Sequence, residues 1–483
     1  MSAAHDFRDT AALAPAPPVR PKLMTVDDAK RLEPKTVADL VTTHMNPGVL
    51  HFMKLLGFHN VIVERAEGPY YYARDGRKIL DFFGGFGSLA FGHNHPQILE
   101  ARRKFQEEKR HDIGMAFLSQ YASTLAFNIA AVSPGGLSTV FLASTGSEAM
   151  EAAIKIAEQA QGPKRSKIAY AEHSFHGKTK GALSLTDSRL YRSQFRLVEN
   201  GVKVPFGDLA ALEAAIKADP EIGVVVLETI QGGAGIVEAP ASYWQGVRAL
   251  CDRHGVLWVA DEVQCGMGRS GRFYAFEHTG VAPDVTALAK SLGGGKSAVG
   301  AMIARPEVFK RAYGSRQTAL VHGPSTFGGM GEACVTAIEA LNILYDENLI
   351  ENAETVGAHL KARLQAIQEK YPRLVKDVRG RGLMLGIELQ DFSSTLPFGI
   401  RQLVATLDEK LKGSLAGFLG NLMLRDYNIL VAFTEYNRNV IRLEPPLVIT
   451  KAHADEFADA LDDLLSRGVV KIVTDFLKAQ RSG

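Results

Sequence analysis

The sequence is poor in cysteine: only Cys251, Cys265 and Cys334 occur among its 483 residues. They lie far apart, and they fit neither a disulfide framework nor the ligand spacing of a zinc site. The chain also lacks an apolar run long enough to cross a membrane, and its N-terminus lacks the charged-then-apolar pattern of a signal peptide. We therefore expect a cytoplasmic protein with no metal site and no membrane partner.

An excess of charge of one sign is also missing. The chain has 55 Lys and Arg residues against 53 Asp and Glu residues, for a net charge of +2, and the basic residues are scattered. No basic patch therefore points to nucleic acid or to an anionic membrane surface. The composition, 46% hydrophobic and 22% charged, is that of an ordinary globular protein.

The organisation of the chain changes along its length. Residues 1–45 are expected to be an N-terminal arm, with weak helical patterning from Thr25 to Leu56, and 68–83 read as a hairpin around an Asp75-Gly76 turn. From residue 84, strands and amphipathic helices alternate, which predicts an α/β fold with a mostly parallel sheet sandwiched by helices. The predicted strands are 139–143, 167–171, 223–227, 256–260, 285–289 and 298–304.

A smaller α+β domain is expected to follow. Its predicted elements are strands at 382–389 and 439–444 and a helix at 451–465. The predicted boundaries are 46–83 for the N-terminal part of this small domain, 84–331 for the large domain, and 332–483 for the C-terminal part. An additional helical segment, 391–421, falls within that last part and is a candidate roof over a substrate entrance, or else a solvent-facing helix or dimer contact.

Two of the predicted strands end in an ionisable residue. The run 256–260 ends at Asp261, and the run 285–289 ends at Lys290. Because the carboxyl ends of parallel strands meet at one edge of a sheet, the acid and the amine are expected there together. A lysine can form a Schiff base with pyridoxal phosphate, and an aspartate can keep the pyridine nitrogen protonated. Taken alone, the two residues fit a structural ion pair better.

Two further stretches suit such a cofactor. In 144–148 (STGSE), a strand gives way to a helix whose N-terminus can hold a phosphate through Gly146 and Ser147; the alternative is an ordinary helix cap. In 174–179 (SFHGKT), Phe175 offers a flat face to a planar ring; the alternative is a core phenylalanine beside a turn.

With these residues in place, the chain resembles the class III aminotransferases of the fold-type-I pyridoxal-phosphate superfamily. The similarity runs from about residue 60 to the C-terminus. Its motifs, in the order of the family, are LDFFGGFGSLAFGHNHP (80–96), STGSEAMEAAIKIA (144–157), SFHGKT (174–179), ETIQGG (228–233), DEVQCGMGRSG (261–271), LAKSLGGG (288–295), STFGG (325–329) and IRLEPPL (441–447).

The resemblance implies roles for individual residues. Lys290 would be the Schiff-base lysine and proton shuttle, Asp261 would pair with the pyridine nitrogen, and Gln264 would bond the phenolic oxygen of the ring. The remaining cofactor-binding residues would be Phe175 and Val263 on the two ring faces, Gly146 and Ser147 at the phosphate, Glu228, and Thr326 donated by the partner subunit. The family also implies a homodimer with shared active sites.

The motifs are closest to putrescine and related ω-amine aminotransferases. The implied reaction moves the terminal amino group of a diamine, ω-amino acid or long-chain amine to pyruvate or 2-oxoglutarate. Arg442 would clamp a substrate carboxylate. Gly233 stands where many members carry a glutamate that gates this arginine, so Arg442 is expected to be more permanently available than in those members. The alternatives are an aminomutase, decarboxylase or racemase on the same scaffold, or a catalytically silent binding homologue.

Overall fold

The computed structural model describes residues 23–113, 117–319, 321, 325–391 and 415–482. The chain divides into two compact units, one ending at Asn60 and one beginning at Val61. The described part of the first unit, from residue 23 onward, contains three helices, which confirms the helical patterning predicted from Thr25 onward: α1 (Val26–Lys30), α2 (Pro34–His44) and α3 (Pro47–Leu56).

The second unit begins with a four-stranded sheet of order β1-β2-β3-β15. Its strands β2 and β3 form the predicted antiparallel hairpin, and β15 comes from far along the chain and pairs in parallel with β3. The N-terminal hairpin and the C-terminal region thus share one sheet. The bounds are β1 (Val63–Glu67), β2 (Tyr70–Ala73), β3 (Lys78–Asp81) and β15 (Ile429–Leu430).

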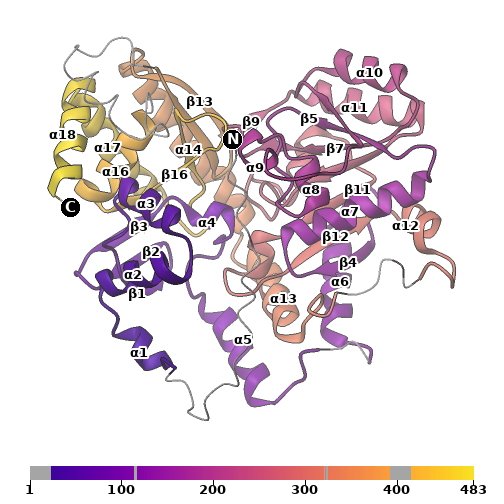
Figure 1. Cartoon of the computed structure of the whole chain (residues 1–483), viewed down its shortest axis with the longest axis horizontal. Coiled ribbons are helices and arrows are strands. Elements are labelled where there is room, and N and C mark those ends of the chain that lie inside the picture. The colour runs from indigo at the N-terminus through magenta and orange to yellow at the C-terminus, as the bar shows by residue number, and fades with distance from the viewer. Residues whose placement is uncertain (1–22, 114–116, 320, 322–324, 392–414, 483) are drawn as a thin grey trace, which may run out of the picture. The chain divides into compact units, whose positions relative to one another are not determined.

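The central element is a seven-stranded sheet of order β4-β12-β11-β10-β7-β5-β6 (Figure 1). Only β12 runs antiparallel to its neighbours, so the prediction of a mostly parallel sheet is confirmed. Every strand predicted for the large domain is present, with ends shifted by at most two residues. The bounds are β4 (Thr139–Ala143), β5 (Lys167–Ala171), β6 (Gly201–Val204), β7 (Ile222–Glu228), β10 (Leu257–Asp261), β11 (Val285–Leu288) and β12 (Gly300–Ala304).

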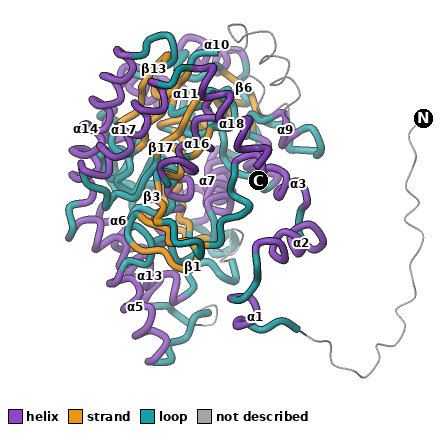
Figure 2. Tube along the Cα trace, turned by 90° about the vertical axis from the view of Figure 1, so that its left-hand side faces the viewer, coloured by secondary structure: helices purple, strands orange, loops and turns teal. Residues whose placement is uncertain are grey.

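Helices cover both faces of this sheet, so its inner strands β7, β10 and β11 are buried throughout and mostly apolar (Figure 2). Successive side chains of a strand point to opposite faces. Val224 and Val226 of β7 therefore pack with α7 (Gly146–Gln161) in one core cluster. On the other face, Trp258 of β10 stacks on Trp244 of α11 (Ala241–His254), with ring centroids 5.6 Å apart.

The remaining sheets are small. A four-stranded antiparallel sheet of order β13-β14-β17-β16 packs against α14, and β8 and β9 form a two-stranded sheet. The predicted strands at 382–389 and 439–444 are confirmed as β14 and β17. The bounds are β8 (Ile230–Gln231), β9 (Val237–Glu238), β13 (Val375–Arg381), β14 (Met384–Leu389), β16 (Ala432–Phe433) and β17 (Val440–Leu443).

Short and long helices complete the second unit. They are α4 (Gly84–Gly87), α5 (Pro96–Glu107), α6 (Gln120–Val132), α8 (Lys180–Ser184), α9 (Arg189–Arg192), α10 (Leu209–Ala218), η1 (Ala275–Thr279), η2 (Lys290–Gly293), α12 (Pro306–Tyr313), α13 (Gly331–Asp346), α14 (Leu349–Lys370), α16 (Leu415–Tyr427), α17 (Lys451–Ser466) and α18 (Val469–Ser482). No helix in the described ranges is both long enough and apolar enough to span a membrane.

Two sequence predictions about organisation stay predictions. Residues 392–414 of the additional segment 391–421 lie outside the described residues, while its last residues begin α16. The division into an arm, a large domain and a two-part small domain is also untested, although β15 pairing with β3 agrees with grouping 46–83 with the C-terminal part.

The packing of α14 generates a stability prediction at Gly357. A Cβ there would lie 2.1 Å from the carbonyl oxygen and 2.3 Å from the carbonyl carbon of Gly382, and backbone cannot move aside as a side chain can. We expect Gly357→Ala to lower the free energy of unfolding by about 2 kcal/mol, despite the better helix propensity of alanine.

The matched control is Gly246→Ala in α11. The Cβ there would meet the tip of the flexible Leu209 side chain, at 2.2 Å from Cδ2. Rotation of that side chain and the helix propensity of alanine should offset the crowding to within about 1 kcal/mol. Thermal unfolding of both variants checks the pair, and equal destabilisation would contradict the role assigned to the Gly382 backbone.

Candidate active site

Three neighbouring strands bring their carboxyl ends to one edge of the central sheet. In register, Glu228 of β7 lies beside Asp261 of β10, and Asp261 lies beside Ala287 of β11. Lys290 follows β11 by two residues and adopts a left-handed backbone conformation, with φ of 48°. Such a conformation is costly for a residue with a side chain and is held by its surroundings. The predicted meeting of acid and amine at this edge is therefore observed.

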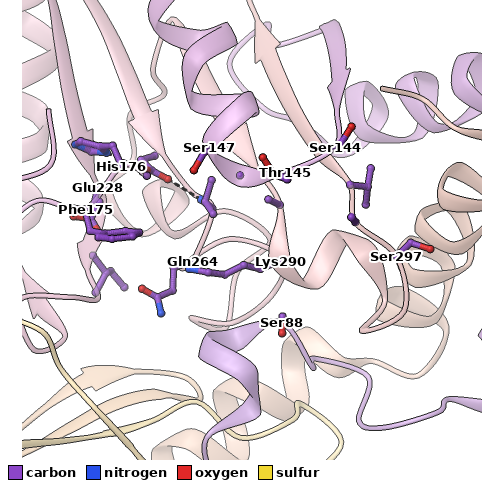
Figure 3. Close-up of a pocket in the computed structure, with 18 residues that line it drawn as sticks. Ser88, Ser144, Thr145, Ser147, Phe175, His176, Glu228, Gln264, Lys290 and Ser297 are labelled. Atoms are coloured by element: carbon purple, nitrogen blue, oxygen red, sulfur yellow. Dashed lines mark hydrogen bonds and ion pairs between the residues drawn. The ribbon is translucent and has the colours of Figure 1, made fainter. Parts of the chain in front are cut away.

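A cavity of about 380 Å³ opens at this edge (Figure 3). Most residues assigned to the site from the sequence line it: Gly146, Ser147, Phe175, Glu228, Asp261, Val263, Gln264 and Lys290. Two do not. Thr326 is exposed, and Arg442 is buried but lies outside the lining. The role predicted for Thr326 in a partner subunit stays a prediction.

The Lys290 amine is held without an anionic partner. Within the described residues, no carboxylate lies at ion-pair distance from Nζ, and Asp261 pairs with His176 instead. This arrangement argues against the structural ion pair that was the alternative interpretation of Asp261 and Lys290. Burial lowers the pKa of Lys290 from its ordinary value, with the Glu444 carboxylate as the largest opposing influence. A desolvated lysine is the form that serves as a nucleophile or base.

Asp261 is oriented by a histidine that the sequence analysis left without a role. The Asp261 Oδ2 atom lies 2.8 Å from Nδ1 of His176, and its Oδ1 atom accepts a hydrogen bond of 3.0 Å from the backbone N–H of Val263. Each carboxylate oxygen keeps a lone pair, so Asp261 can accept one further donor from the cavity. The sequence signal that could have identified His176 is its position as an ionisable residue directly after Phe175 in the SFHGKT motif.

The N-terminus of α7 forms a cradle suited to a phosphate. Thr145 caps the helix through a hydrogen bond of 3.1 Å from Glu148 N–H to its Oγ1 atom, so the ordinary cap is present as well. A Cβ on Gly146 would lie 2.9 Å from Cγ1 of Val263, so only glycine leaves the backbone open to a ligand. Together with the hydroxyl of Ser147, these groups fit an anion at the positive end of a helix.

The side of the cavity toward Phe175 is fixed by Glu228. The Oε1 atom of Glu228 accepts a hydrogen bond of 2.9 Å from the backbone N–H of Phe175. Burial raises the pKa of Glu228 to about 7. Phe175 and Val263 both line the cavity, which is compatible with a planar ring between them.

Gln264 is engaged on its amide nitrogen. Its Nε2 atom donates to Oε2 of Glu444 at 3.0 Å and to the backbone oxygen of Phe86 at 3.4 Å. The predicted bond from Gln264 to a phenolic oxygen therefore stays a prediction, and it would have to share or replace one of these contacts.

Arg442 has a carboxylate neighbour that the sequence expectation did not consider. Its Nε atom lies 3.3 Å from Oε2 of Glu444, which supplies a carboxylate partner although Gly233 does not. The guanidinium also lies over the ring of Phe86, 4.6 Å from the centroid. The sequence analysis missed Glu444 although it stands in the IRLEPPL motif, two residues after the arginine.

The loop after β3 places Phe86 at the site. All four residues from Gly84 to Gly87 have left-handed backbone conformations, with φ between 54° and 82°. The loop is anchored by Asp81, whose Oδ1 atom accepts from the N–H groups of Phe83 and Gly84 at 2.9 and 2.8 Å. A Cβ on Gly84 would lie 2.0 Å from the backbone oxygen of Glu444, so the loop and the arginine strand approach closely.

Comparisons with known proteins agree on one family. A family model described as Aminotransferase class-III matches residues 56–465. The chain is 34% identical over 445 residues to Aminotransferase PigE of a Serratia strain, an alignment covering 86% of this chain. It spans 52% of the length of that curated relative.

Solved structures are similar over most of the chain. The ornithine aminotransferase of Toxoplasma gondii has a TM-score of 0.76 at 26% identity, covering 95% of this chain and 98% of that one. An amine transaminase from an uncultivated Pseudomonas species, in a PLP-bound form, has a TM-score of 0.75 at 27% identity, covering 84% and 95%.

The buried Glu228 generates a prediction about pH. Because its pKa is about 7 in the folded protein, against an ordinary value of 4.5, the folded state binds the proton more tightly. The resulting stabilisation is complete below about pH 4.5 and is lost as the pH rises through about 7. We expect Glu228→Gln to remove this component, up to about 3 kcal/mol.

The measurement is the free energy of unfolding of the cofactor-free protein at about pH 4.5 and about pH 8. Groups whose pKa is set by neighbours other than Glu228, such as Glu262, titrate equally in both proteins and cancel in the difference. Glu369→Gln, at an exposed position on α14, is the matched control and should follow the wild type. An unchanged pH dependence in Glu228→Gln would contradict the prediction.

Proposed function

The chain belongs to the class-III aminotransferase family, whose cofactor is pyridoxal 5'-phosphate, and from this premise we propose its reaction. It moves the terminal amino group of a diamine, ω-amino acid or long-chain amine to a 2-oxo acid, either pyruvate or 2-oxoglutarate. The observation that carries the proposal is the position of Lys290, partly buried and without a carboxylate partner, at the sheet edge that also presents Asp261. The similarity to an amine transaminase and to an ornithine aminotransferase supports an amine donor.

The cavity fits the cofactor in three places. The N-terminus of α7, with Gly146 and Ser147, would hold the phosphate, and Asp261 would accept the N–H of the pyridine ring. Phe175 and Val263 would cover the two faces of the ring. When bound, pyridoxal phosphate supplies an electron sink for the charge left on the donor carbon. The His176–Asp261 hydrogen bond keeps the carboxylate aligned for that purpose.

Lys290 would perform the proton transfers. Because burial lowers its pKa, more of the amine is unprotonated near neutral pH than in an exposed lysine. The amine can then take a proton from the carbon that bears the donor nitrogen and return it on the cofactor side. Val263 and Ala289 contribute apolar side chains to the lining of the same cavity.

The assembly we propose is a homodimer with shared active sites, in which Thr326 reaches the site of the partner. Large apolar side chains near that residue support it, because they are solvent-exposed in the single chain. The Ala122 side chain of α6 lies against Gly329, three residues after Thr326. Asp112, in the segment before α6, accepts a hydrogen bond from the backbone N–H of Glu332 at the start of α13. The exposed side chains of these segments are Phe117, Leu118, Phe127, Val321 and Phe327. Three free, buried cysteines support the proposed cytoplasmic location.

The first test replaces Lys290. We expect Lys290→Ala to fold and bind the cofactor but to lose at least about 100-fold in amino transfer, the usual contribution of a general base. The cofactor absorbance of the wild type should change on adding an amine donor and return on adding a 2-oxo acid. Lys310→Ala, an exposed lysine on α12, is the control. A wild type whose absorbance no amine changes would refute the proposed reaction.

The second test concerns the dimer. Leu118 is 98% exposed in the single chain. We expect Leu118→Glu to dissociate the dimer and to lower activity in parallel, because a buried unpaired charge destabilises an interface. Val470→Glu on α18, also at an exposed apolar position, should leave the mass unchanged in sedimentation analysis. A wild-type monomer with full activity would contradict the shared site.

A further inference from the structure

Glu444 is a fully buried carboxylate directly after β17, and no role has yet been assigned to it. Its Oε2 atom accepts the Gln264 hydrogen bond and lies 3.3 Å from Nε of Arg442. Its Oε1 atom is buried and has no hydrogen-bond partner among the described residues. A buried carboxylate oxygen without a donor is costly, so the residue is retained for something other than packing.

The groups around Glu444 are mostly cationic. Burial lowers the pKa of Arg442 from its ordinary value, and Glu444 is the strongest of the carboxylates that oppose this shift, ahead of Glu435. Burial likewise lowers the pKa of Arg269 to about 10, again with Glu444 as the largest opposing influence. Glu444 is also the largest opposing influence on Lys290. One carboxylate thus offsets three neighbouring cations.

The contact between Arg442 and Glu444 leaves the arginine able to change partners. Although the Nε–Oε2 distance is 3.3 Å, the buried Nε atom makes no hydrogen bond. The ion pair therefore lacks the bidentate geometry in which arginine holds a carboxylate most strongly. A substrate carboxylate can compete for the guanidinium, but it must do so against the charge of Glu444.

Gly233 has no side chain with which to pair with Arg442. Its backbone oxygen accepts hydrogen bonds from the N–H groups of Glu435 and Tyr436. A Cβ on Gly233 would lie 3.4 Å from the Tyr436 ring, an ordinary van der Waals contact, and that ring is held by a hydrogen bond of 2.7 Å from its hydroxyl to the backbone oxygen of Ser174. In this chain the carboxylate beside Arg442 is therefore that of Glu444.

We propose that Glu444 determines the donor specificity of this site: by pairing with Arg442, it disfavours donors whose far end is a carboxylate and favours donors whose far end is an ammonium. This inference rests on the proposed amino transfer and names its preferred donor class, the diamines. Removing the charge leaves Arg442, Arg269 and Lys290 without the neighbouring anion, so the preference should reverse toward carboxylates.

The experiment compares Glu444→Gln with the wild-type holoenzyme on three donors with four carbons each: butane-1,4-diamine, 4-aminobutanoate and butylamine. The first half-reaction is followed in single turnover by the cofactor absorbance, so that no 2-oxo acid competes for Arg442. We expect the ratio of rate constants for the diamine over the amino acid to fall at least about tenfold. The rate constant for butylamine, whose far end carries no charge, should change less than the rate constant for either of the other two donors.

A binding measurement gives a second readout without turnover. Butanoate, which cannot donate an amino group, should bind Glu444→Gln at least about tenfold more tightly than the wild type in calorimetry. In an Arg442→Ala background, Glu444→Gln should alter the ratio and the affinity much less, because the coupling between these two residues is absent and only the effect of Glu444 on Arg269 and Lys290 remains. Glu435→Gln, the next carboxylate acting on Arg442, should produce a smaller change.

The contrary outcomes are distinct. An equal fall for all three donors would mean that Glu444 only positions Gln264, and an unchanged ratio with unchanged butanoate affinity would also overturn the inference. If Glu444→Gln does not load the cofactor, Glu444→Met is measured instead, because methionine removes the charge and needs no hydrogen bond. Failure of the wild type to react with any donor refutes the proposed function, while butanoate binding still tests Glu444.

Discussion

The site depends on the parallel register of β7, β10 and β11. Because residues of neighbouring strands lie side by side, Glu228, Asp261 and the turn that carries Lys290 lie at one edge, each at or directly after the end of its strand. Helices on both faces bury this sheet, and that burial lowers the pKa of the lysine and raises the pKa of Glu228. The fold and the reactivity of the site therefore share a physical cause, the removal of these groups from water.

Several of the buried ionisable groups have a specific partner, which makes their burial less costly. His176 pairs with Asp261, Phe175 N–H donates to Glu228, and Glu444 lies between Gln264 and Arg442. Lys290 differs from these groups, since no described carboxylate lies at ion-pair distance from its amine. The reactive amine is thus left unpaired beside carboxylates that have partners.

The sequence predicts the strands, their order in the chain, and eight residues of the cavity lining, because hydrophobic runs and their terminal residues are local signals. It could not reveal that His176 meets Asp261 or that Glu444 meets Arg442. Those contacts join segments 85 residues apart, or depend on the backbone path after β17. The expectation for Arg442 stays a prediction; it considered only position 233 and not Glu444, whose Oε2 atom lies 3.3 Å from the arginine Nε. Thr326 and the domain boundaries stay predictions.

The left-handed loop from Gly84 to Gly87 limits how the amino acids around the site can differ between relatives. A side chain at Gly84 would collide with the backbone of Glu444, and one at Gly87 would come within 3.2 Å of its Oε1 atom. Of these four positions only Phe86, which covers the guanidinium of Arg442, carries a side chain. Natural variation in this segment is therefore expected mainly at position 86. Relatives that keep this loop conformation should differ in the donor pocket mainly through the aromatic residue at 86.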